Sequence, residues 1–127
     1  MGFVTLFSRD GRIREATAVP VTAAGSGAYP NAMAVRLESA MIGTRLSQYR
    51  DEYAYQGLST DALLFAMTRG ENATVLSFCS ATTLTCPAPG GASIRFEGFS
   101  PQIWKHESNM LSLRISAPAD GVIRITV

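Results

Sequence analysis

The sequence predicts a mainly β protein, with a β-sandwich or jelly-roll-like antiparallel fold and one or two short helices between residues 40 and 70. Two observations support this fold class. From residue 72 onward, apolar and polar residues alternate with a period of two in several short runs. Glycine and proline clusters separate these runs, which is typical of sandwiches and partly closed barrels. Because 127 residues suit one core, we expect a single β-rich domain over residues 1–127.

The first 31 residues predict a β-hairpin and then a loop. Phe3–Ser8 is rich in β-branched and aromatic residues, and Asp10-Gly11 is a dipeptide that adopts the positive φ angles of a tight turn. We expect the second strand over Arg12–Val21, with its end at a sheet edge because Pro20 has no N–H to donate. The small residues at 23–31 then predict an exposed loop.

The region from residue 32 to residue 57 predicts a short strand followed by a helix. Apolar residues alternate at first, at Met33, Val35 and Leu37. Farther along they recur at spacings of four, three and four, as on one face of a helix, at Ile42, Leu46, Tyr49 and Tyr53. Gly43 costs such a helix about 1 kcal/mol relative to alanine, which leaves a loop with a frayed turn as the alternative.

The segment Ser59–Arg69 predicts a second helix, of about ten residues. Ser59 or Thr60 supplies an N-cap, and Gly70 follows the last turn as a C-terminal cap. The apolar side chains that we expect to be buried in this helix are Leu63, Leu64 and Met67.

The rest of the chain predicts strands. Runs with a period of two cover Val75–Ser80, Ile94–Glu97, Leu111–Ile115 and Ile123–Val127. The breakers between them lie at 87–91, 98–101 and 117–121.

Charge and hydropathy argue against nucleic acid and membranes as partners. Eleven basic and ten acidic residues leave a net charge of +1, so no overall field attracts nucleic acid or an anionic membrane. No stretch approaches the roughly 18 to 20 apolar residues of a membrane span, and the first residues lack the features of a signal peptide. We therefore expect synthesis in the cytoplasm, with no nucleic acid and no membrane as partner.

The cysteines and the single histidine do not predict a reactive site. Cys79 and Cys86 have six residues between them, a spacing that permits a disulfide across a loop, but without a secretory signal we favour two free, buried thiols. A structural zinc site takes four ligands, so we expect no metal and no cofactor. His106 and its neighbour Glu107 point to opposite faces of a strand, and no catalytic motif is present. We expect no enzyme; a small enzyme built on these two residues and an arginine is the least favoured alternative.

Two groups of apolar residues are candidates for an interaction surface. Phe96, Phe99 and Trp104 offer aromatic faces that stack against other groups, although a tryptophan in the core is the plainer interpretation. The carboxyl-terminal run lacks the lysine or proline that usually protects a sheet edge, and we expect it to be an edge that accepts another strand. The alternative is burial inside one sandwich, which satisfies the same main-chain groups without a partner. The apolar residues of this run are Ile123, Ile125 and Val127.

Composition favours a structural role. The chain is poor in lysine and glutamate and nearly neutral, which suits packing into an assembly better than life as a free monomer. We therefore expect a non-enzymatic assembly protein, either a homo-oligomer or part of a larger particle. The most concrete expectation is a virion component, such as a phage capsid-decorating, head-joining or tail protein. The alternative is a carbohydrate- or small-molecule-binding module that uses Trp104 and tyrosines.

Overall fold

The computed structural model describes residues 17–19, 21–23, 26–28, 32–37, 40–45, 53–55 and 57–127. All the regular structure in these ranges is antiparallel strand, so the chain is mainly β. The strands are β1 (Thr17–Val19), β2 (Val21–Ala23), β3 (Ser26–Ala28), β4 (Ala32–Leu37), β5 (Ala40–Arg45), β6 (Tyr53–Tyr55), β7 (Leu58–Thr60), β8 (Leu64–Arg69), β9 (Ala73–Pro87), β10 (Ser93–Glu97), β11 (Ile103–Glu107) and β12 (Met110–Thr126).

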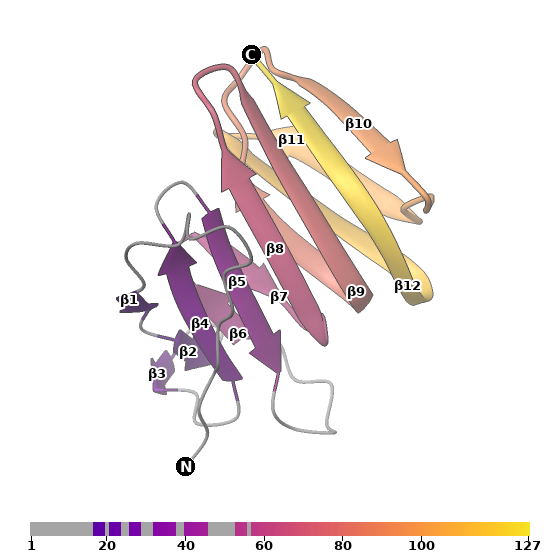
Figure 1. The fold of residues 1–127 in the computed structure, drawn as a ribbon. Helices are drawn as coiled ribbons and strands as arrows, with labels where there is room; N and C mark the ends of the chain where they lie inside the picture. Colours follow the sequence, from indigo (N-terminus) through magenta and orange to yellow (C-terminus); the bar gives the residue numbers. More distant parts are fainter. Residues whose placement is uncertain are drawn as a thin grey trace.

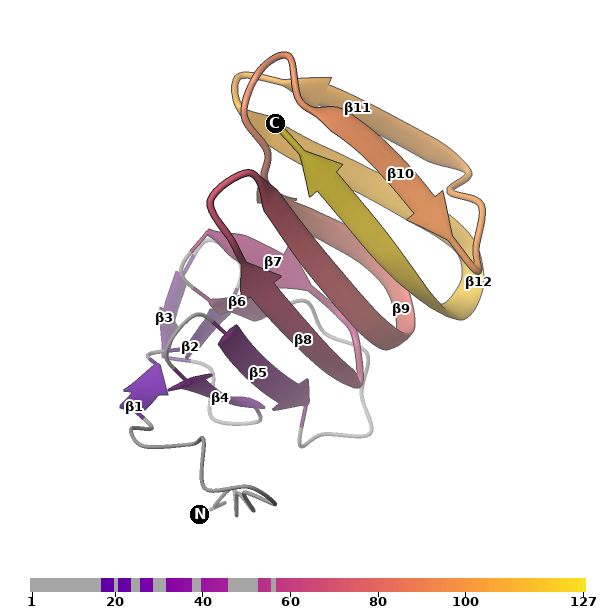
Figure 2. The same cartoon turned by 45° about the horizontal axis from the view of Figure 1, so that its top comes forward.

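The strands form one continuous sheet that folds over into two layers (Figure 1). The long strands β9 and β12, of 15 and 17 residues, run through both layers and pair with each other along most of their length. The first half of β9 also pairs with β8, and its second half pairs with β7. Figure 2 shows β8 and β10 in the layer nearer the viewer, with β7 and β11 in the layer behind. Bends in the long strands therefore place the strands of one sheet in two stacked layers.

The line along which the strands bend is here named the crease. It crosses residues 60–63 between β7 and β8, residues 80–83 in β9 and residues 115–121 in β12, where the register with β9 shifts. Buried Asp61 holds the crease on one side of β9: its Oδ1 accepts hydrogen bonds from the backbone N–H of Thr82 at 2.7 Å and of Thr83 at 3.0 Å. The Thr82 hydroxyl donates to the other carboxylate oxygen.

A second carboxylate holds the crease on the other side of β9. Asp120 Oδ1 accepts a hydrogen bond of 2.8 Å from the backbone N–H of Ser80, a residue with a positive φ of 55°. Because positive φ is disfavoured for a non-glycine residue, this hydrogen bond stabilises a backbone conformation that the bend requires.

The core lies between the two layers and takes alternate residues from each strand. The buried apolar residues include Leu58, Phe65, Met67, Leu76, Phe78, Leu84, Cys86, Leu111, Leu113, Ile123 and Ile125. Burial of these side chains is what makes the period of two visible in the sequence after residue 72.

The predicted helix over Ser59–Arg69 is wrong. This segment forms β7, a turn at the crease and β8, and burial alternates so that Phe65 and Met67 are buried while Leu64 is exposed. Leu63 is exposed as well, against the expectation that it would be buried. The reason is that β5 and β9 flank β8 on both sides, so pairing with these strands satisfies the peptide groups and overrides the local pattern.

Thr60, which was a candidate for the helix cap, forms a turn instead. Thr60 Oγ1 accepts a hydrogen bond of 3.1 Å from the N–H of Ala62 and donates one of 2.7 Å to the carbonyl of Thr83. A threonine that bonds to the N–H two residues on forms a local turn as readily as it caps a helix. The predicted helix cap is therefore wrong: Thr60 bonds to a nearby N–H, but the chain continues as a strand after it.

The structure confirms some of the other predicted elements and contradicts others. The strand near Met33 is confirmed as β4, and the predicted loop at 23–31 contains β3. The helix expected between Ile42 and Tyr53 is wrong where the structure describes it, because β5 and β6 cover its two ends. The breaker at 117–121 shifts the register of β12 without ending it. The first strand and the turn of the amino-terminal hairpin, residues 3–11, lie outside the described residues. Within the predicted second strand Arg12–Val21, the structure describes β1 (Thr17–Val19) and the start of β2 at Val21. A closed sheet is not observed among the described strands, and a sandwich or jelly roll is not confirmed.

Candidate functional site

Strands β10 and β11 form an open edge of the folded sheet. In the part of the chain that the structure describes, each of them pairs with β12 on one side and has no strand on the other. Figure 2 shows the two strands at the same end of the molecule, one in each layer. We use the name open edge for β10 and β11 together.

A tight turn positions β11. Ser108 and Asn109 connect β11 to β12, with φ angles of 54° and 61°, the values of a two-residue hairpin turn. Asn109 also anchors the turn to the preceding loop, since its Oδ1 accepts from the N–H of Gly90 at 2.8 Å and its carbonyl accepts from the N–H of Ala88 at 2.9 Å. Hydrogen bonds between the turn and the preceding loop therefore fix one end of β11.

Two aromatic rings meet across the layers at this edge. Phe96 in β10 lies opposite buried Ile123, and Trp104 in β11 lies opposite buried Leu113, so both rings are on the core-facing side of their strands. Their centroids are 5.3 Å apart in an edge-to-face arrangement. The pair closes the gap between the layers.

Phe99 extends this contact into the core. Its ring centroid lies 5.4 Å from that of Phe96 and 5.0 Å from that of buried Phe78. The ring also covers Gly121 so closely that a Cβ at this position would lie 2.3 Å from Phe99 Cδ1. The structure thus brings together the three aromatic residues selected from the sequence, in a row that leads from Phe78 to Trp104.

The carboxyl-terminal residues selected from the sequence are placed differently. Ile123 and Ile125 are 0% and 1% exposed, because they belong to the core. Strand β12 pairs with β9 on one side and with β10 and β11 on the other, so the expectation that the last strand is a sheet edge is wrong. Val127, which follows the strand, is 72% exposed.

At the open edge, sequence reasoning missed the exposed apolar residue Ile103. It is 64% exposed and Trp104 is 49% exposed, although adjacent residues in a strand point to opposite faces. Both faces of β11 are therefore accessible. Alternation in the sequence cannot predict that both faces are accessible. It distinguishes the two faces of a strand, but it does not show whether a neighbouring strand lies beside it.

Ion pairs lie on the outer face of the open edge. The Lys105 Nζ and Glu107 Oε1 atoms are 3.0 Å apart, and both side chains are largely exposed. Glu97 accepts from Arg124 Nε at 2.9 Å and lies 3.5 Å from Arg95 Nε. The two arginines lie directly opposite each other, so this carboxylate offsets a repulsion between like charges.

The cysteines are free thiols. They lie seven residues apart along β9, too far along one strand for a disulfide geometry. Burial raises the pKa of the Cys86 thiol to about 12, and the positive charge of Arg69 partly offsets this effect. A hydrogen bond to the Asp120 carboxylate, together with burial and the charge of that carboxylate, raises the pKa of Cys79. Both shifts reduce the thiolate fraction, so neither thiol is an activated nucleophile.

His106 bonds to the backbone. Its Nε2 lies 2.9 Å from the carbonyl oxygen of Ala88, and Glu107 beside it is on the other face of β11. Within the described ranges, His, Cys, Asp and Glu side chains do not gather in threes as a metal site requires.

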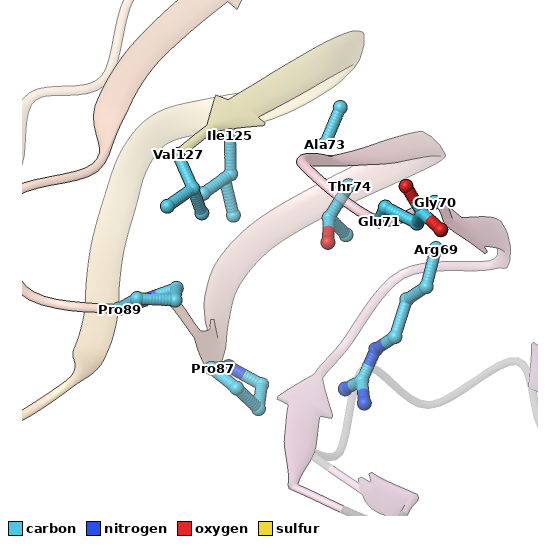
Figure 3. Close-up of a pocket in the computed structure, with 9 residues that line it drawn as sticks. All are labelled: Arg69, Gly70, Glu71, Ala73, Thr74, Pro87, Pro89, Ile125 and Val127. Carbon is cyan, nitrogen blue, oxygen red and sulfur yellow. The ribbon is translucent and has the colours of Figure 1, made fainter.

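A pocket of about 230 Å³ lies at the end of the layers near Val127 (Figure 3). Its lining consists of Arg69, Gly70, Glu71, Ala73, Thr74, Pro87, Pro89, Ile125 and Val127. Figure 3 shows the Arg69 side chain extending from the end of β8 toward Pro87 and away from Glu71. The lining therefore contains one cation, Arg69, one carboxylate, Glu71, and several apolar side chains, and Trp104 is not part of it.

Comparisons with protein-family models, with curated proteins and with solved structures gave no match to this chain. No helix in the described part of the chain is long and apolar enough to cross a membrane. The open edge and the pocket are therefore the features of this molecule that bear on its function.

Proposed function

We propose that this protein is a non-enzymatic assembly module that associates with other protein subunits through its open edge. The observation that carries the proposal is the exposure of apolar side chains on both faces of β11, at Ile103 and Trp104. A partner that covers one face of the sheet contacts only one of them. A strand added beside β11 contacts both, because its own side chains alternate between the same two faces.

The main chain supports the same mode of association. An edge strand presents N–H and C=O groups that a second strand can pair with. The turn and the aromatic row hold β11 in an extended conformation before any partner arrives, which reduces the entropy cost of binding. In this proposal the two layers act as a small β-sandwich and the open edge is the docking strand.

The particular class that we propose is a virion component, such as a phage capsid-decorating, head-joining or tail protein. Its support is compositional: charged residues make up only 17% of the sequence, which leaves few charged groups to desolvate at an interface. The genes that flank the coding sequence test this class. Portal, capsid or tail genes alongside support it, and a metabolic operon contradicts it.

Association is tested with the tryptophan that the chain itself supplies. Trp104 is the one tryptophan of the sequence and lies at the open edge, so its emission should shift to the blue as concentration rises and subunits associate. Analytical ultracentrifugation measures the mass in parallel. Ile103→Ser should weaken association, whereas Leu64→Ser, which removes an exposed leucine elsewhere, should not. Equal effects of the two substitutions would exclude the open edge as the interface.

A second candidate function is the binding of a small anionic molecule in the pocket of Figure 3. Arg69 has no ion-pair partner among the described residues, and the proline and aliphatic side chains opposite it suit an apolar body with one carboxylate. Calorimetric titration with an aromatic carboxylate such as benzoate tests this function. We expect binding to the parent protein and a loss of binding in Arg69→Gln; equal heats in both proteins would contradict it.

A further inference from the structure

We propose that the partner at the open edge is a second copy of this chain, and that its β11 pairs antiparallel with the first in one register. In that register Lys105 of each copy lies opposite Glu107 of the other. The inference rests on the proposed function, because it names the partner and the geometry of the association proposed there.

The turn at the end of β11 shows which main-chain groups face the open edge. Glu107 and Met110 lie opposite each other across a two-residue turn, and such a turn closes on a hydrogen-bonded pair. Because hydrogen-bonded pairs alternate along an antiparallel ladder, Lys105 and Ile103 also direct their N–H and C=O groups toward β12. Trp104 and His106 therefore direct theirs toward the open edge.

This direction limits the registers that two copies of β11 can adopt. Residues whose N–H and C=O groups point toward the open edge must lie opposite each other in the two copies. The allowed registers therefore differ by steps of two residues. One register places Lys105 opposite Lys105 of the partner subunit, and another places Glu107 opposite Glu107 of the partner subunit. Like charges directly opposite each other destabilise a strand pair. A third register leaves Lys105 opposite Ile103 of the partner subunit, with no charge pairing.

The remaining register centres on His106 and pairs Lys105 with Glu107 of the partner subunit. Two-fold symmetry makes this contact occur twice. The Lys105 and Glu107 side chains are 69% and 66% exposed and already lie 3.0 Å apart within one chain, so the interface joins two ion pairs into an alternating row of four charges. In this register Trp104 and Ile103, the two exposed apolar residues of β11, lie opposite Ser108 and Asn109 of the partner subunit, the residues of its turn.

Charge reversal tests the register. Lys105→Glu leaves two acidic residues on β11, and Glu107→Lys leaves two basic ones, so each variant opposes like charges in its own homodimer. We expect each to self-associate about tenfold more weakly than the parent, from two reversed cross-strand pairs. An equimolar mixture of the two variants should associate as tightly as the parent, and so should the double variant Lys105→Glu/Glu107→Lys. Both side chains are exposed, so equal urea midpoints, measured at a concentration where all the proteins are monomeric, show that the fold is intact.

The outcomes separate this inference from the proposed function. If the parent associates and both single variants associate equally well, the register is wrong while assembly stands. If the parent associates only with other proteins, the second copy is the wrong partner. A parent chain that stays monomeric at all concentrations, with unchanged Trp104 emission, overturns the self-association proposed here and also removes the first support for the proposed function.

Discussion

Asp61→Ala should be among the most destabilising single substitutions at the crease. Asp61 is 3% exposed, and its Oδ1 accepts hydrogen bonds from the N–H groups of Thr82 and Thr83 at 2.7 and 3.0 Å. Alanine leaves both donors without this acceptor. A buried donor without a partner costs about 1–3 kcal/mol, and the two together should therefore cost about 3 kcal/mol. Alanine also removes the acceptor of the Thr82 hydroxyl.

Asp61→Asn is the matched control. Asparagine keeps an oxygen at the Oδ1 position, so both backbone donors retain an acceptor and only the stronger bond to a charged group is lost. We expect a cost of about 1 kcal/mol for this variant.

Urea denaturation followed by circular dichroism measures both variants. The midpoints should rank parent, Asp61→Asn and Asp61→Ala, with unchanged slopes that indicate the same surface exposed on unfolding. Equal midpoints for the asparagine and alanine variants would show that the carboxylate charge, and not the acceptor geometry, stabilises the crease. A midpoint of the alanine variant equal to that of the parent would refute the role of this residue altogether.

Three further predictions follow from contacts in the same half of the molecule. Gly121→Ala should cost about 1–3 kcal/mol because its Cβ meets the Phe99 ring at 2.3 Å, and the same substitution in a Phe99→Ala background should cost almost nothing; equal costs in both backgrounds would exclude the clash. The raised pKa of Cys86 keeps the folded thiol neutral, so its contribution to stability is complete below pH 9.0, the unfolded value, and is lost as pH rises toward about 12. Between neutral pH and about pH 10 the parent should therefore lose about 1.4 kcal/mol more than Cys86→Ala, and parallel pH profiles would contradict this. Asn109→Ala removes the acceptor of the Gly90 N–H and a residue suited to a φ of 61°, which should cost about 1–2 kcal/mol; an unchanged urea midpoint would argue against the anchored turn.

The sequence by itself determined most of the strands in the second half of the chain. The alternation at Val75–Ser80, Ile94–Glu97 and Leu111–Ile115 coincides with β9, β10 and β12, because one face of each strand is buried between the layers. The aromatic candidates Phe96 and Trp104 were also recognisable, since rings of this size seldom occur together without a packing role.

Local patterns failed where the chain bends. The segment Ser59–Arg69 has the capping residues of a helix, yet its second half forms a strand because two neighbouring strands were available to pair with it. Neighbours of this kind come from distant parts of the sequence, so no window of ten residues contains the information. The same is true of Asp61, which lies within the segment predicted to be a helix and which the fold uses to hold the crease.

Only the tertiary structure decided which strand is left with a free side. The last strand of the chain, β12, inserts between β9 and the pair β10 and β11, so Ile123 and Ile125 become core while Ile103 becomes exposed. The order of strands across a sheet depends on contacts between residues far apart in the chain. Alternation along a strand reports which face of that strand is buried, and it contains no information about which strand lies beside it.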